Sequence, residues 1–320
     1  MGMIGPQFQT TGPEAQTAEL ATAEEFRIEV SEGAWRERLA SVWRYCRENP
    51  ALPVGVGVIV LMLMVGPIGG RFIDPALAAP LSGPADHPPS LAFPLGTDDS
   101  GRNLAAVVVA GLPLTFQVGF MAGAIGVLIG TILGFLGGYL GGWVDAVVRS
   151  ASDILLTVPA LIVLVTIASS LKGAVTVSIE ALVISLLAWM WPTRTIRSQV
   201  LPLRERGFVQ VAKLSGVGTP ELIVKELIPN LLPYLAASFV TSTSAAILAS
   251  IGIEAIGLGP QNSPTMGMTI YWAIQFNALL RGLWWWWLTP IVVLGVLFIS
   301  LFLATTGLDA IANPRAHRAR

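Results

Sequence analysis

The sequence predicts an all-α, polytopic membrane protein, and three observations lead to that prediction. Of the 320 residues, 53% are hydrophobic and only 12% are charged, whereas soluble domains carry about 25% charged residues. Lysines and arginines gather in alternate connections between the apolar stretches. Six of these stretches approach or exceed the roughly 20 residues that a spanning helix needs, and they cover residues 52–70, 104–136, 143–171, 175–191, 234–258 and 287–308.

The positions of the basic residues predict how these spans are oriented. If the N-terminus lies in the cytosol, 15 of the 19 lysines and arginines fall on the cytosolic side and 4 on the other. Basic residues of short connections are retained in the cytosol. We therefore expect a multi-pass protein of a bacterial cytoplasmic membrane with six transmembrane helices and both termini in the cytosol.

Several kinds of chemistry have no support in the sequence. The single cysteine, Cys46, cannot form an internal disulfide or a thiolate cluster, and the two histidines, His87 and His317, stand apart in polar segments. No GxxxxGK[ST] phosphate loop occurs, although the chain has three lysines. We expect no catalytic residue, no metal site, no bound cofactor and no nucleic-acid partner, so that any ATP hydrolysis takes place on another polypeptide.

A polar stretch over residues 204–233 stands out among the apolar ones. Gly216 and Gly218 separate two predicted short helices. The second is expected to start at residues 219–221, where a threonine N-cap precedes a proline and an acid, and to end before Pro229. The first is predicted by apolar or small residues at helical spacing: Phe208, Val211, Ala212 and Ser215. Such a stretch, held close to the membrane on both sides, is typical of a docking element for a soluble partner.

The same stretch resembles the EAA loop of the permease subunits of bacterial ABC importers. That family has Glu-Ala-Ala, three residues, Gly, nine residues, and then hydrophobic-x-hydrophobic-Pro; this chain keeps the spacing but has Gln, Val and Glu at three positions. In the family this loop is the coupling helix that enters a cleft of the ATPase. The resemblance implies an ATPase-coupling role for six residues: Gln210, Val211, Ala212, Gly216, Glu226 and Pro229.

Other segments resemble the C-type permeases of the dipeptide, oligopeptide and nickel branch of that family. Residues 47–55 resemble the family's N-terminal entry, residues 93–103 its PxGTDxxGRD segment, and residues 137–145 its GGYxGGxxD turn. Within the second segment, Asp98, Asp99 and Arg102 are interpreted as caps and a surface ion pair rather than as an acidic catalytic pair or a cation site.

The resemblance, from about residue 44 to residue 315, implies a type I ABC importer permease that forms half of a translocation pathway. It implies four kinds of protein partner or surrounding: a second homologous permease, two ATPase subunits that bind ATP and Mg, an extracytoplasmic substrate-binding protein, and membrane lipid. Peptides are the expected substrates. Oligosaccharides and nickel stay open within the same class, and an ion-coupled secondary transporter is the alternative from a different class.

The fifth span is expected to line the pathway, because it is the richest in hydroxyl groups and contains a buried acid. Its candidate pathway residues are Ser242, Ser250 and Glu254. Acids inside a membrane face an interior cavity or a partner. Two interpretations of Glu254 stay open: a substrate-facing or gating acid, or a carboxylate near the outer interface that pairs with Arg281 or with the partner permease.

Two further patterns carry structural predictions. Glycines recur every four residues at Gly126, Gly130, Gly134 and Gly138, which predicts a close helix–helix approach. The four tryptophans at residues 284–287 are expected to form an interfacial belt, the alternative being a sugar-stacking platform.

These patterns divide the chain into four predicted parts. Residues 1–50 are a cytosolic tail with an interfacial helix, and residues 51–103 hold the first span and an outer loop. Residues 104–312 form the permease core with its coupling loop at 204–233. Residues 313–320 are a second cytosolic tail.

Overall fold

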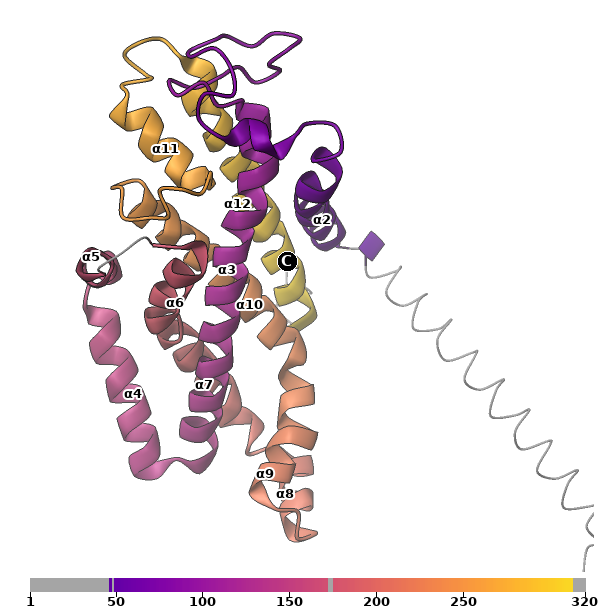
Figure 1. Cartoon of the computed structure of the whole chain (residues 1–320). Helices are drawn as coiled ribbons and strands as arrows, with labels where there is room; N and C mark the ends of the chain where they lie inside the picture. Colours follow the sequence, from indigo (N-terminus) through magenta and orange to yellow (C-terminus); the bar gives the residue numbers. More distant parts are fainter. Residues whose placement is uncertain (1–45, 48, 172–174, 313–320) are drawn as a thin grey trace, which may run out of the picture. The chain divides into compact units, whose positions relative to one another are not determined.

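The chain from Ala51 onward folds into a bundle of helices (Figure 1). The computed structural model describes residues 46–47, 49–171 and 175–312, and within these ranges the only β pairing is an isolated bridge between Thr97 and Asn103. The all-α prediction is therefore confirmed. Both predicted tails lie largely or wholly outside the described residues.

Among the described residues, four helices are long and apolar enough to cross a membrane. They are α2 (Ala51–Gly69), α3 (Leu104–Phe135) with the π-helical turn η2 (Leu136–Leu140), α10 (Ile228–Glu254) with the segments before it, and α12 (Trp284–Ala312). The remaining helices are shorter: η1 (Pro75–Ala78), α4 (Gly142–Thr157), α5 (Ala160–Ser170), α6 (Val177–Ala188), α7 (Met190–Leu203), α8 (Gly207–Leu214), α9 (Thr219–Leu222), the π-helical turn η3 (Ile223–Leu227) and α11 (Met266–Gln275).

The predicted third span is broken. Helices α4 and α5 meet at an angle of 82°, and as a broken pair they count as a fifth candidate span. The break lies at Val158, which has an extended backbone (ψ 130°) and precedes Pro159. Proline disfavours helical backbone in the residue before it, so the long apolar run cannot continue as one rod. The predicted fourth span appears as the short apolar helix α6 followed directly by α7. The prediction of a polytopic fold is confirmed, whereas six separate spanning helices are not.

The glycine pattern on α3 produces the predicted close packing. A Cβ atom at Gly126 would lie 2.7 Å from the carbonyl oxygen of Ala188, and one at Gly130 would lie 2.6 Å from Cβ of Pro192. Gly134 and Gly138 likewise face α7, while Gly119 and Gly123 face Ile247 and Thr243 on α10. Because lipid provides no hydrophobic drive for helix association, contacts of this closeness hold such a bundle together. Helix α3 thereby becomes the central element against which α6, α7 and α10 pack.

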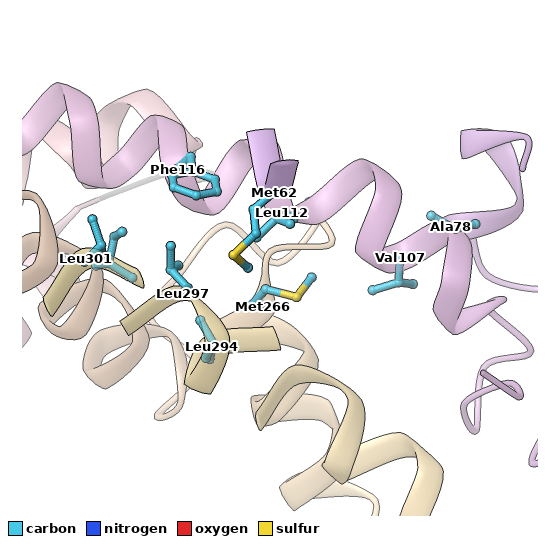
Figure 2. Packing of buried hydrophobic residues seen from close by; sticks show 11 residues of the cluster. Met62, Ala78, Val107, Leu112, Phe116, Met266, Leu294, Leu297 and Leu301 are labelled. Carbon is cyan, nitrogen blue, oxygen red and sulfur yellow. The ribbon is translucent and has the colours of Figure 1, made fainter. Parts of the chain in front are cut away.

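A buried cluster joins α2, α3, α10, α12 and the start of α11. Figure 2 shows Phe116 and Leu112 of α3 near Leu297 of α12 and Met266 of α11. These side chains are almost fully buried. Close packing in this cluster attaches α11, which follows an irregular segment, to the spanning helices.

We name the two ends of this bundle after the predicted orientation. The outer end carries residues 71–103 and 255–283, and the inner end carries η2 and residues 204–227. At the outer end, the Arg281 guanidinium bonds Asp99 (2.6 Å) and Asp86, which ties the outer loop to the segment before α12. Trp285 also bonds this loop, because its Nε1 donates to the carbonyl oxygen of Thr97 at 3.1 Å.

The four tryptophans do not share one face. Trp286 is buried against the core cluster around Leu104, whereas Trp284 is exposed, and the rings of Trp284 and Trp285 stand edge to face at 83°. Consecutive helical residues point in different directions, so this set provides no flat stacking platform.

Candidate functional site

The first helix of the candidate coupling loop ends at Gly216. The backbone N–H of Val217 donates to the carbonyl of Ala212 at 3.1 Å, and Gly216 has a φ of +80°. This is a Schellman-type ending, in which a left-handed residue closes the last turn. Glycine adopts that backbone without the strain that a Cβ atom brings. Gly216 therefore sets the direction in which the chain leaves α8.

Helix α8 has a buried anchor and an exposed apolar row. Val209 is fully buried, together with Leu222 and Leu227, against Phe135 of α3 and against Ile196 and Val200 of α7. In contrast, Val211 is 62% exposed and Leu214 is 89% exposed. Of the predicted face, Phe208, Val211 and Ser215 are exposed, whereas Ala212 is partly buried against the cluster that contains Val209. The fully buried residue that holds α8 in place is Val209.

The second helix of the loop does not end before Pro229, contrary to the prediction. Helix α9, the turn η3 and α10 form one continuous helix, Thr219–Glu254. In η3 the backbone bonds span five residues, and the N–H of Ile228 reaches the carbonyl of Ile223. A π-helical turn of this kind shifts the bond pattern by one residue, which accommodates the missing amide of Pro229.

Polar contacts attach the coupling loop to the inner end of α3 and η2. Arg204 Nη1 donates to the carbonyl oxygen of Gly138 at 2.8 Å, and the ammonium of Lys213 lies 5.0 Å from the centre of the Tyr139 ring.

Asp145 at the start of α4 forms a two-bonded ion pair with Arg197 of α7. Gln210 is exposed, whereas Glu226 is half-buried next to Lys225, which pairs with Glu221 at 2.7 Å.

A second group of polar residues is buried where α6, α10 and α11 meet. Ser250 Oγ lies 2.8 Å from Oε1 of Glu180 and 3.2 Å from Oε1 of Glu254. The Thr265 hydroxyl donates to Oε2 of Glu254 at 2.8 Å. The exposed fractions are 2% for Glu180 and 1% for Glu254. Glu254 thus bonds α11 and Ser250, and it does not pair with Arg281 as one of the two interpretations proposed.

The geometry of this group indicates that one of the two carboxyls is protonated. Within the part of the chain that the structure describes, no lysine, arginine or histidine forms an ion pair with Glu180 or Glu254. Two uncompensated carboxylates buried together would be very costly. A serine hydroxyl has one hydrogen to donate, so the second short contact of Ser250 is satisfied when one carboxyl carries a proton. We call Glu180 and Glu254 the acid pair.

Sequence reasoning missed Glu180, Thr265 and Asp309. Glu180 could have been found from the sequence, because it is an acid inside an apolar stretch, the same signal that identified Glu254. The other two carry no local signal, because their roles depend on what folds against them. Asp309 of α12 lines a cavity of about 90 Å³ together with Ser242, Ser238 and Thr241 of α10.

Of the predicted pathway residues, the structure brings Ser250 and Glu254 together and places Ser242 elsewhere. Ser242 lies at the 90 Å³ cavity and at an apolar cavity of about 200 Å³ between α10, α6 and α5. The described residues contain no group of three or more histidines, cysteines or acids that would hold a metal ion.

Comparison with known families identifies the kind of protein. The family described as "Binding-protein-dependent transport system inner membrane component" matches residues 126–318, which is more than half of the chain. The chain belongs to this family. It is a permease subunit of an ABC importer and a multi-pass inner-membrane protein, as the resemblance implied. The matched range contains the coupling loop, the acid pair and the glycine pattern.

Three relatives named as peptide permease proteins are each 28% identical to this chain. The dipeptide transport system permease protein of Bacillus subtilis (strain 168) is 28% identical over 281 residues, which cover 86% of this chain and 85% of that protein. A putative peptide permease protein of Brucella abortus is 28% identical over 230 residues, or 71% of this chain and 75% of that protein. The oligopeptide transport system permease protein of Bacillus subtilis is 28% identical over 217 residues, or 67% and 69%.

Proposed function

We propose that this permease subunit forms half of the pathway of a peptide importer, with a second homologous permease, two ATPase subunits and an extracytoplasmic binding protein. The names of the relatives support peptides as the substrate class. ATP and Mg belong to the ATPase subunits, and both termini of this chain lie in the cytosol. The observation that carries the proposal is the exposed apolar row of α8 beside Gly216, within the matched range.

The coupling loop is proposed to bind the ATPase through the exposed side of α8. Val211 and Leu214 leave apolar surface unpartnered, while Val209 and Leu222 hold the loop to the spanning helices. We assign to the same ATPase-binding loop four further residues: Gln210, Ala212, Glu226 and Pro229. Gln210 is exposed beside that row, and Pro229 lies in the first turn of α10, inside the continuous helix Thr219–Glu254.

A continuous helix offers a route from that loop to the outer end. The helix Thr219–Glu254 has 36 residues, which corresponds to about 54 Å at 1.5 Å per residue. Its first turns belong to the coupling loop and its last residue belongs to the acid pair. Displacement of the loop by ATPase closure would therefore move Glu254 relative to Glu180 and Thr265. We infer that Ser250 and Glu254 act in gating, and that Ser242 faces the pathway.

Reconstitution tests this function. The full assembly in proteoliposomes, with binding protein outside and ATP inside, is expected to accumulate a labelled dipeptide or oligopeptide. In the variant Leu214→Asp, the ATPase should no longer co-purify, because a charge is introduced into the apolar row. Leu280→Asp, which adds the same charge at an exposed leucine of the outer end, is the control. Uptake driven by an ion gradient without ATP would favour a secondary transporter, and uptake of xylo- or cello-oligosaccharides alone would change the substrate class.

A further inference from the structure

A pocket at the outer end is separate from the coupling loop and the acid pair. Its volume is about 360 Å³, and it lies between the turn η1 and the segment that precedes α11. Arg102 and Ala110 form its floor from the α3 side. Its remaining lining is polar on one side, from Gln261, Asn262 and Ser263, and is made of proline and alanine on the other.

Arg102 is the unusual residue in this pocket. Its side chain is only 17% exposed, yet its guanidinium makes no hydrogen bond to any described residue, and Nε is buried without a partner. A guanidinium has five N–H donors; the one on Nε is buried, and a buried donor without an acceptor is costly. The guanidinium carbon also lies 5.9 Å from the centre of the Trp272 ring. This ring contact positions the guanidinium but accepts none of its hydrogen bonds.

Asp98 is the nearest acid, but it accepts no hydrogen bond from the Arg102 guanidinium. Oδ2 of Asp98 lies 3.9 Å from Nε of Arg102, which is too long for a hydrogen bond. Oδ1 is occupied, because it accepts from the backbone N–H groups of Ser100 and Arg102 at 2.9 and 2.8 Å. Burial raises the pKa of Asp98, while the neighbouring Arg102 and the backbone N–H bonds act in the opposite direction.

The polar side of the pocket adds donors of its own. The side chains of Asn262 and Ser263 make no hydrogen bond to other described residues, and Asn262 is exposed at the mouth. An amide N–H and a hydroxyl can both donate to an oxygen anion. The pocket thus combines two further donors with a guanidinium whose nearest acid lies beyond hydrogen-bond distance, at 3.9 Å.

We propose that this pocket binds a carboxylate group. A carboxylate accepts two parallel bonds from a guanidinium, and this charge-assisted pairing is stronger than bonds between neutral groups. The volume accommodates an acidic side chain or the end of a peptide. Resting on the proposed function, the carboxylate has two possible sources at this end: an acidic side chain of the binding protein, or the C-terminal carboxylate of the transported peptide.

Two pairs of matched variants test the site in the full assembly in nanodiscs. Arg102→Gln removes the guanidinium, and Arg71→Gln removes the same charge from an exposed position of the outer loop. Asn262→Asp places a negative charge at the mouth without touching buried residues, and Asn277→Asp makes the same change in an exposed turn away from the pocket. The second pair keeps the test decisive if Arg102→Gln fails to assemble.

The affinity of loaded binding protein for the assembly is measured first. Arg102→Gln and Asn262→Asp are expected to weaken it by about tenfold, equivalent to about 1.4 kcal/mol, while both controls stay within about twofold. If affinity is unchanged, uptake of a peptide is compared with uptake of its C-terminal amide. A loss confined to the free acid would assign the carboxylate to the peptide.

The outcomes separate this inference from the proposed function. Equal behaviour of Arg102→Gln, Asn262→Asp and their controls in both assays, with normal wild-type uptake, overturns the carboxylate site alone. Wild-type assembly that takes up no peptide overturns the proposed function instead, and binding-protein affinity still tests the pocket.

Discussion

Ser250 on α10 bonds Glu180 on α6, with 2.8 Å between Oγ and Oε1, although the two residues are 70 positions apart. Through this bond and the contact of Ser250 with Glu254, the last turn of the long helix is attached to α6. The bond from Thr265 extends the connection to α11. One buried group therefore links three elements at the outer end.

Replacing Glu254 by Gln is expected to change transport while the subunit still assembles. The amide keeps the shape and can still bond Ser250 and Thr265, but it cannot exchange a proton with Glu180. Uptake and substrate-stimulated ATP hydrolysis are the measurements, and Asp153→Asn, the same acid-to-amide change at a half-exposed side chain of α4, is the control. Wild-type values for both would remove Glu254 from the mechanism.

Truncating the same residue should instead affect stability. Glu254→Ala leaves the Thr265 hydroxyl without its buried acceptor, and an unsatisfied buried group costs about 1–3 kcal/mol. We expect a lower thermal midpoint for Glu254→Ala than for Glu254→Gln in detergent. Equal midpoints would show that the bonds to Glu254 contribute little.

In the coupling loop, Gly216→Pro is expected to abolish transport without preventing membrane insertion. Proline fixes φ near −65°, whereas Gly216 has φ +80° and its N–H donates to the carbonyl of Lys213. Gly207→Ala is the matched control, because no atom lies within 4 Å of its added Cβ and its φ is not positive. Transport at wild-type level in Gly216→Pro would show that this loop does not couple.

The glycine pattern predicts a stability difference on the spanning helices. At Gly126 an added Cβ would lie 2.7 Å from a backbone oxygen of Ala188, so Gly126→Ala must displace α3 or α6. Overpacking of this kind costs about 1–3 kcal/mol. At Gly295 on α12 no atom lies within 4 Å, and Gly295→Ala should be neutral or slightly stabilising. Thermal unfolding of the two variants compares them, and equal midpoints would contradict the packing shown here.

The ion pair between Asp145 and Arg197 predicts coupling between α4 and α7. Both side chains are about one-fifth exposed and share two bonds. A double-mutant cycle with Asp145→Asn and Arg197→Gln should give an interaction energy of about 1 kcal/mol in thermal or denaturant unfolding. The cycle formed by the exposed pair Lys225 and Glu221 is the comparison, and it is expected to give a smaller interaction energy because solvent screens exposed charges. Additive effects at Asp145 and Arg197 would mean that the pair does not hold α4 in place.

Local patterns in the sequence were sufficient for much of this protein. Composition predicts the helical membrane fold, the spacing of glycines predicts where α3 is approached closely, and Gly216 predicts the end of α8. Each depends on residues within a few turns of one another, where periodicity and backbone preferences act directly. The EAA-like spacing identified the family from one stretch in the same way.

What only the tertiary structure decided involves residues brought together from distant parts of the chain. Pro229 predicts a helix end, yet the helix continues through it. The π-helical turn η3 shifts the hydrogen-bond pattern before the missing amide, and Leu222 and Leu227, at the two ends of that turn, are buried in the core. Glu254 bonds Ser250 and Thr265 rather than Arg281, and Nε of Arg102 is buried without an acceptor although Asp98 is near. The partner of a buried charge depends on which helices pack together, and local sequence preferences do not encode that choice.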